Sequence, residues 1–299
     1  MIVITGATGH TGRPAAEAVL TAGVPVRVVG RDAKNLEPLV EKGAEAFVGS
    51  AEDPESMAHA FEGAKIAYLL IPGVQVDDFS AYQERVINSY ATAIAKARVP
   101  FAVTLSSMGA QHAEKTGPIV ALHNMEEKLN QISGLNVLHL RPAMFMENLL
   151  LSMTPLRTMG ILPGGSPGDV PRHWIAAKDI GAYAAKRLLA RDFIGSSAQE
   201  LMGPRDVSMK EVAEIIGKAI GKPGLGYMQV PFIMLEPALV QMGMSKKMAA
   251  LMVEMMQAGN DGMLTAQQPR SAKNTTATTM EAFVEDIFAP AYATKAAGA

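Results

Sequence analysis

The sequence contains no cysteine. Disulfide bonds, thiolate metal sites and cysteine nucleophiles are therefore excluded, and we expect the protein to work in the reducing cytoplasm. Blocks of like charge are also missing, and the formal net charge is only −2 over 299 residues. The chain thus lacks the electrostatic footprint of a protein that binds nucleic acid or an anionic membrane surface. We expect a small-molecule substrate; a homodimer or a protein partner stays open.

Long apolar runs are absent as well. No apolar segment reaches the length of about 18 residues that a membrane-spanning helix needs, and the chain begins in a strand-like segment without a cationic leader. We therefore expect no membrane association. The histidines are too scattered in type and spacing to predict a metal site. What is present is an ordinary globular composition, 48% hydrophobic, which suffices for a large core.

A glycine-rich turn is the most informative motif. Residues 2–5 read Ile-Val-Ile-Thr, an apolar strand, and lead into Gly-Ala-Thr-Gly-His-Thr-Gly at 6–12, which a helical pattern follows at once. Such a turn leaves backbone N–H groups and the positive end of a helix dipole without partners, and a pyrophosphate supplies them. We expect Gly6 to allow the tight turn, Gly9 to admit the phosphate, and Gly12 to let the helix pack on the strand.

The segment after this unit indicates which dinucleotide binds. A second strand at 24–29 completes a βαβ unit and is followed by Gly-Arg-Asp-Ala-Lys at 30–34. The Arg31 guanidinium can fork onto a phosphate and Lys34 can add a second charge, which favours the 2′-phosphate of NADP(H). Asp32 could accept a ribose hydroxyl, which keeps NAD(H) possible, although we favour Asp32 as a helix N-cap. The alternative for Arg31 is a solvated charge at a strand end.

Alternating strand-like and helix-like segments predict an α/β fold with a doubly wound parallel sheet, whose ligands lie beyond the carboxyl ends of the strands. The expected strands are 2–5, 24–29, 46–49, 66–71, 101–106 and 137–140, and the expected helices are 11–22, 33–42, 54–62, 79–97 and 117–132.

The pattern becomes shorter and richer in turns after Arg141-Pro142. We expect a Rossmann domain at 1–150, a smaller α+β substrate region at 151–290 and a loose tail at 291–299. Expected helices in the second region are 178–190, 209–220 and 242–256. The last carries a methionine stripe, which could line a cavity for apolar ligands but is more typical of a packing or dimer face.

Several segments together resemble the NmrA-like family of atypical short-chain dehydrogenases/reductases. The resemblance rests on residues 3–12, Arg31 to Lys34, 133–137, 140–148, Ala-Lys-Asp-Ile-Gly at 177–181, 201–204 and 279–283. It implies a Rossmann domain that binds NADP(H), less often NAD(H), and a small C-terminal substrate cleft. Some members reduce quinones, dyes or plant phenolic ethers, whereas others bind the nucleotide and report its redox state to a protein partner.

Candidate cofactor contacts follow from the motif, the strand ends and the resemblance. They are Gly6, Thr8, Gly9, His10, Thr11, Gly12, Arg31, Lys34, Leu70, Ile71, Pro72, Ser106, Pro142 and Phe145.

The helix expected at 117–132 lacks the Tyr-x-x-x-Lys pair of typical short-chain dehydrogenases and carries His-Asn-Met-Glu-Glu at 123–127. His123 could transfer a proton near neutral pH, with Glu127 one turn on to orient its ring. Alternatively, His123 bonds the nicotinamide ribose or lies on a solvated face. Ser107 is a second catalytic candidate, because it and Ser106 follow the fifth strand; both could equally cap the loop.

We therefore expect an NADP(H)-dependent reductase of a quinone-like or other conjugated small molecule, because such an acceptor can dispense with the Tyr-Lys pair. The alternative is a non-catalytic, NADP(H)-sensing regulatory protein. A nucleotide-sugar epimerase or dehydratase is less favoured, since those enzymes use the missing pair.

Overall fold

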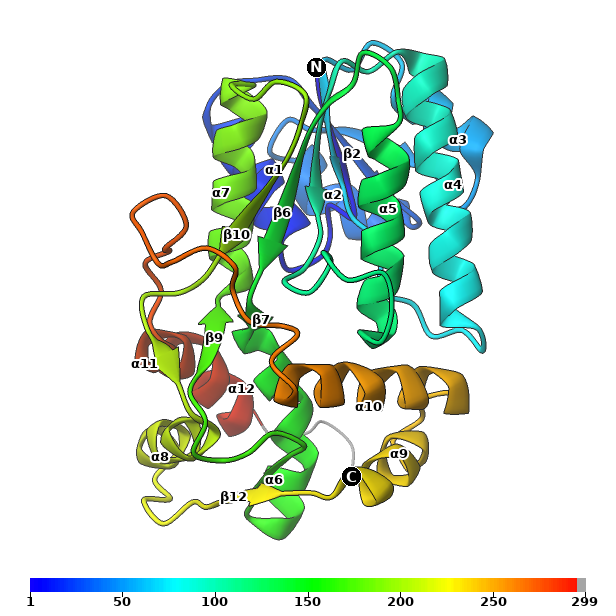
Figure 1. The fold of residues 1–299 in the computed structure, drawn as a ribbon. Helices are drawn as coiled ribbons and strands as arrows, with labels where there is room; N and C mark the ends of the chain where they lie inside the picture. The colour runs from blue at the N-terminus through cyan, green and yellow to red at the C-terminus, as the bar shows by residue number, and fades with distance from the viewer. Residues whose placement is uncertain (295–299) are drawn as a thin grey trace.

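A computed structural model of the protein describes residues 1–294, which fold around a seven-stranded parallel sheet in the order β10-β6-β5-β4-β1-β2-β3 (Figure 1). Its strands are β1 (Ile2–Thr5), β2 (Val26–Gly30), β3 (Glu45–Val48), β4 (Ile66–Leu69), β5 (Phe101–Leu105), β6 (Asn136–Pro142) and β10 (Ser196–Leu201). The helices around it are α1 (Gly12–Thr21), α2 (Ala33–Val40), α3 (Pro54–Ala60), α4 (Phe79–Ala97), the 3-10 turn η1 (Gly117–Ile119), α5 (Val120–Asn130) and α7 (Ala177–Ala190).

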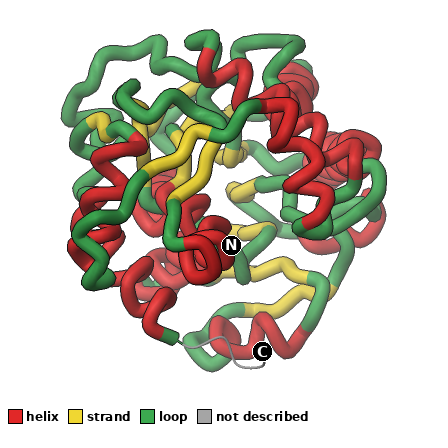
Figure 2. Tube along the Cα trace, turned by 90° about the horizontal axis from the view of Figure 1, so that it is seen from below, coloured by secondary structure: helices red, strands yellow, loops and turns green. Residues whose placement is uncertain are grey.

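The sheet is covered on both faces, which explains why its central strands are apolar at successive positions. In β1, Ile2 and Ile4 pack with α1 and α7, whereas Val3 packs on the opposite face with α3 and α4. Helices lie on both sides of the central strands (Figures 1 and 2). The prediction of a doubly wound fold is confirmed.

The six predicted strands are all present, with ends shifted by up to two residues. The seventh strand, β10, was not predicted: its residues Ser-Ser-Ala-Gln-Glu-Leu carry little apolar signal, because it pairs only with β6 at the edge. α7 and β10 follow residue 150 but pack with the sheet. The division of the chain at residue 150 stays a prediction.

The C-terminal part builds a third core from small sheets and helices. Its elements are β7 (Met144–Phe145), η2 (Met146–Ser152), α6 (Met153–Met159), β8 (Leu162–Gly164), β9 (Arg172–Ile175), β11 (Asp206–Val207), α8 (Met209–Ala219), β12 (Tyr227–Gln229), α9 (Phe232–Gln241), α10 (Lys246–Asn260), α11 (Met280–Phe283), η3 (Val284–Phe288) and α12 (Ala289–Ala293).

Two expectations for this part were wrong. The helix expected at 242–256 does not begin at Met242, because Gly243 adopts a φ of +98° and separates α9 from α10. The tail expected at 291–299 starts too early, since Ala291 to Ala293 complete α12. The remaining tail residues, 295–299, lie outside the described residues.

Candidate functional site

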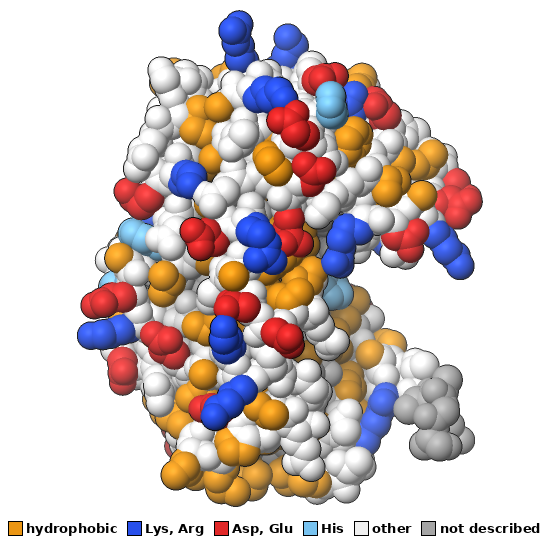
Figure 3. All heavy atoms as spheres, turned by 90° about the vertical axis from the view of Figure 1, so that its right-hand side faces the viewer, with side chains coloured by type: hydrophobic (Ala, Val, Ile, Leu, Met, Phe, Trp, Pro, Cys, Tyr) orange, Lys and Arg blue, Asp and Glu red, His pale blue; other side chains and the backbone are white. Residues whose placement is uncertain are grey.

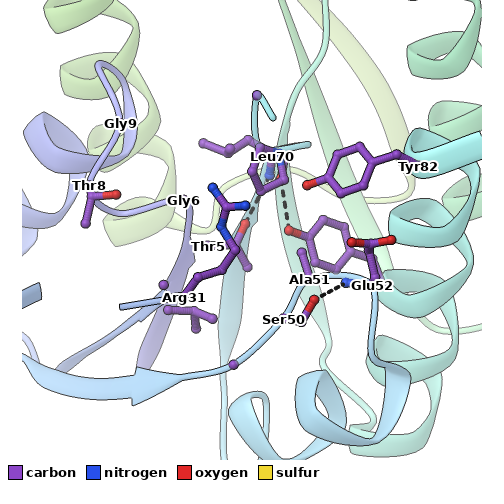
Figure 4. A pocket seen from close by; sticks show the side chains of 16 residues that line it. Thr5, Gly6, Thr8, Gly9, Arg31, Ser50, Ala51, Glu52, Leu70 and Tyr82 are labelled. Atoms are coloured by element: carbon purple, nitrogen blue, oxygen red, sulfur yellow. Dashed lines mark hydrogen bonds between the residues drawn. The ribbon is translucent and has the colours of Figure 1, made fainter. Parts of the chain in front are cut away.

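The candidate site is a pocket of about 200 Å³ at the carboxyl ends of β1 to β4 (Figure 4). β1 pairs with β2 on one side and with β4 on the other, so the chain order reverses here. Ligands of doubly wound sheets bind at such a switch point. The molecule is also hollowed on one side, between its upper and lower parts (Figure 3).

The glycine-rich turn forms one wall of this pocket. Gly6 has a φ of +58°, and a Cβ there would lie 2.4 Å from Leu70 Cδ1. A Cβ on Gly12 would lie 2.2 Å from the carbonyl oxygen of Gly6, so only glycine allows α1 to begin this close to β1. Thr11 makes no side-chain cap of α1. The first turn of α1 keeps the Gly12 amide and a positive dipole end for an anion, because the Arg13 N–H bonds the Gly9 carbonyl and Pro14 has no N–H.

Arg31 lines the same pocket at the end of β2 and forms no ion pair within residues 1–294. The neighbouring Asp32 is engaged elsewhere. Its carboxylate accepts the backbone N–H of Lys34 at 2.9 Å and caps α2. The favoured interpretation of Asp32 as an N-cap is thus confirmed, and its carboxylate does not neutralise Arg31 by pairing with it.

Of the predicted cofactor contacts, the pocket brings together Gly6, Thr8, Gly9, Arg31, Leu70 and Pro72. Outside this lining lie His10, Thr11, Gly12, Lys34, Ile71, Ser106, Pro142 and Phe145.

Sequence reasoning missed the wall that faces Arg31. Ser50, Ala51 and Glu52 follow β3, and Tyr82 and Tyr90 come from α4. Ser50, Ala51 and Glu52 could have been predicted from the position of β3 beside β2, because the carboxyl ends of the strands near the switch point reach the pocket.

Two of these missed side chains are held firmly. Glu52 pairs with Arg85 at 2.7 Å. The Tyr82 ring stacks on Phe79 with 5.9 Å between ring centroids, and burial raises the pKa of its hydroxyl. The wall thus presents a paired carboxylate and a hydroxyl toward the pocket (Figure 4).

His123 lies on α5 and is half-buried. Its Nδ1 is 2.9 Å from the carbonyl oxygen of Ala110, which can only accept, so Nδ1 carries the proton and Nε2 is the nitrogen left for exchange. Glu127, expected to orient the ring, is exposed and forms no hydrogen bond with it. That expectation was wrong because a carbonyl of the β5–η1 loop takes the role.

A buried ion pair lies behind the loop that follows β5. Arg141 of β6 donates from Nε and Nη2 to the two oxygens of Glu126 on α5, at 3.0 and 2.5 Å. The Glu126 carboxylate also raises the pKa of Arg141. Ser106 Oγ donates to Glu126, so its proton is already engaged, and a contact of Ser106 with the cofactor stays a prediction. Ser107 Oγ donates to the Met108 carbonyl at 2.9 Å.

Glu126 is the main residue that the sequence prediction overlooked. It is only 3% exposed, although its neighbours Asn124 and Glu127 are exposed. A signal existed, since residue 126 lies four positions after Leu122 and three before Leu129, on the buried stripe of the helix.

His139 forms a second buried polar group. Thr104 Oγ1 is 2.8 Å from its Nδ1, and Nε2 is 3.0 Å from Asn130 Oδ1. Nε2 therefore donates to the amide oxygen while Nδ1 accepts the threonine hydroxyl, which requires a neutral ring. Burial lowers the pKa of His139 to about 4.

Between residues 1 and 294, no three histidine, aspartate or glutamate side chains gather closely enough to hold a metal ion. Over the same residues, no helix combines the length and the apolar character needed to cross a bilayer.

The sheet order and the switch-point pocket define a doubly wound α/β protein of the Rossmann type. The chain belongs to the NmrA-like family, whose model matches residues 1–284. It is 27% identical over 259 residues to an NAD(P)H azoreductase of Xenophilus azovorans, covering 85% of this chain and 86% of that protein. It is 29% identical over 223 residues to a (4-alkanoyl-5-oxo-2,5-dihydrofuran-3-yl)methyl phosphate reductase of Streptomyces griseus, covering 75% of each.

Among solved structures, an NADPH-dependent quinone oxidoreductase from Escherichia coli, complexed with NADPH, superimposes with a TM-score of 0.81 at 22% identity. The match covers 96% of this chain and 100% of that one. A Citrobacter triphenylmethane reductase complexed with NADP(H) superimposes with a TM-score of 0.75 at 19% identity, covering 95% and 99%. These likenesses confirm the fold.

The lowered pKa of His139 predicts that the folded protein loses stability in mild acid. Its folded pKa of about 4 lies below its ordinary 6.5, so the unfolded chain binds the proton more readily. The stabilisation is complete above pH 6.5 and falls as the pH drops toward 4. Urea unfolding should show that the wild type loses about 2–3 kcal/mol more than His139→Gln between pH 7.5 and 4.5. His59→Gln, at an exposed site, should retain the wild-type profile; parallel curves for wild type and His139→Gln would contradict the assignment.

The Glu126→Ala variant should be much less stable than the wild type, because it leaves the Arg141 side chain, which is only 18% exposed, without its counter-charge. We expect the free energy of unfolding to fall by about 3–5 kcal/mol in urea denaturation. The matched control is Glu127→Ala on the exposed face, which should change it by less than about 0.5 kcal/mol. Similar values for the two variants would refute the structural role of the pair.

Proposed function

We propose that this protein is an NADP(H)-dependent reductase of a quinone-like or other conjugated small molecule. One observation carries the proposal: Arg31, without an ion-pair partner in residues 1–294, faces the switch-point pocket that the glycine turn walls. A free guanidinium there suits the 2′-phosphate that distinguishes NADP(H) from NAD(H). The azoreductase and furan reductase relatives support reduction of conjugated acceptors.

The residues present fit the nucleotide. The Gly12 amide and the positive dipole end of α1, beside Gly9, would hold the pyrophosphate, and Arg31 would hold the 2′-phosphate. Glu52 and Tyr82 would bound the adenosine half of the pocket. Room at Gly9 supports this arrangement, because a Cβ there would meet only the Gly6 carbonyl oxygen, at 3.3 Å.

The reaction needs one proton from the protein. Bound NADPH would supply a hydride, and a quinone that gains a hydride and one proton becomes a hydroquinone. His123 would provide that proton from Nε2 of its doubly protonated ring, which leaves the neutral ring with its remaining proton on Nδ1, where the Ala110 carbonyl accepts it. After turnover, Nε2 would regain a proton from solvent, to which the half-buried ring has access.

Arg31→Ala should weaken NADPH binding far more than NADH binding, because only NADPH offers a 2′-phosphate. Loss of a charge-assisted contact costs about 1.5–3 kcal/mol, or roughly tenfold to a hundredfold in affinity. Fluorescence titration with both nucleotides measures it, and Lys42→Ala serves as a control because Lys42 pairs with Glu17 on the surface. An equal loss for NADPH and NADH would remove the NADP(H) assignment.

His123→Ala should lower kcat by about 10²-fold to 10⁴-fold if Nε2 delivers the proton in the rate-limiting step, with the Kd of NADPH near wild type. A panel of quinones and azo dyes supplies the acceptors. Weakened NADPH binding with unchanged saturated turnover would instead assign His123 to the ribose, and no change in either would leave it without a role. If NADPH binds but wild-type protein reduces no acceptor, the nucleotide-sensing alternative replaces the reductase.

A further inference from the structure

α10 lies against η1, the turn that leads into α5 and its candidate proton donor, His123. A Cβ on Gly117 of η1 would lie 2.1 Å from the carbonyl oxygen of Leu251, so the α10 backbone packs directly on this turn. Just beyond α10, the side chain of Leu264 lies as closely over Gly109. Figure 1 shows α10 crossing below α5. The helix and the segment after it therefore pack on η1 and on the β5–η1 loop.

The N-terminal end of α10 is fastened to the segment between β4 and α4. Ser245 Oγ donates to the Asp77 carbonyl oxygen at 3.1 Å, and Lys247 Nζ donates to Asp78 Oδ2 at 2.5 Å. The bond from Lys247 lowers the pKa of Asp78, which is therefore ionised at neutral pH. At the other end, Arg172 of β9 bonds the Asn260 side chain at 2.7 Å.

The fastened segment leads directly to the nucleotide pocket. Toward the N-terminus it reaches Pro72 and Gly73, which line the pocket, and residues 71–76 carry no regular secondary structure. In the other direction, Asp78 Oδ1 caps α4 by accepting the Ala81 N–H at 3.1 Å, and Tyr82 in the first turn also lines the pocket. Asp78, the partner of Lys247, is thus only a few residues from the pocket in both directions along the chain.

We propose that Ser245 and Lys247 are positioning residues that couple α10 to nucleotide occupancy. A nucleotide that contacts Pro72, Gly73 and Tyr82 orders the segment before α4, and the bonds to Ser245 and Lys247 pass this order to α10. α10, which packs on η1, is then held there more firmly when the nucleotide is bound. The inference rests on the proposed function and adds a link between the nucleotide pocket and α10.

Hydrogen exchange of the full chain tests the coupling, with NADPH as the probe. In the wild type, NADPH should slow amide exchange across residues 246–252. Lys247→Met should lose most of this slowing, whereas Lys246→Met should keep it, because Lys246 forms no ion pair with residues 1–294. Equal slowing in all three proteins, or none in wild-type protein that demonstrably binds NADPH, overturns the coupling.

Steady-state kinetics with 1,4-naphthoquinone give a second readout. An exposed ion pair has a small effect, so Lys247→Met should raise the KM of the quinone by about twofold to fivefold, with kcat unchanged and the Kd of NADPH shifted by no more than that factor. Asp78→Asn keeps the cap of α4 and should raise the KM of the quinone by the same factor as Lys247→Met. The double variant should raise it no further. Additive effects of the two changes overturn the pairing. If the wild-type protein does not bind NADPH, the proposed function fails together with the coupling. If it binds NADPH but the variants behave like the wild type, only the coupling fails.

Discussion

The close approach of α1 to β1 is the constraint on which the rest of the structure depends. Gly12 lies beneath the Gly6 carbonyl, and a Cβ on Gly181 of α7 would lie 2.5 Å from the Thr11 carbonyl oxygen. Three segments therefore meet at the N-terminal end of α1 with backbone against backbone. This packing fixes the N-terminal end of α1 behind the glycine turn, where Arg31 and the β4–α4 segment complete the pocket.

Much of the fold could be predicted because local patterns and tertiary burial agree. The inner strands β1, β2, β4, β5 and β6 are apolar where both faces are covered, and the cap of α2 was predicted at Asp32. β10 escaped prediction because an edge strand with several exposed positions needs little apolar sequence. α9 and α10 were misjudged because periodicity alone hides the break at Gly243.

The site was only half visible in the sequence for a physical reason. The glycine turn and Arg31 are contiguous with strand ends, so their placement follows from the βαβ unit. Glu52 and Tyr82 reach the pocket only through the order of strands and the packing of α4. Glu126 was hidden because a carboxylate on a buried stripe is stable only with its partner, and Arg141 comes from a different element.

The central claim is that the pocket beside Arg31 binds the 2′-phosphate of NADP(H). Calorimetric titration of the wild-type protein with 2′,5′-ADP and with 5′-ADP tests it without any acceptor or variant. The account predicts that 2′,5′-ADP binds about tenfold to a hundredfold more tightly and competes with NADPH, since only it places a phosphate on the guanidinium. Equal affinity for the two fragments, or binding that NADPH does not displace, would contradict it.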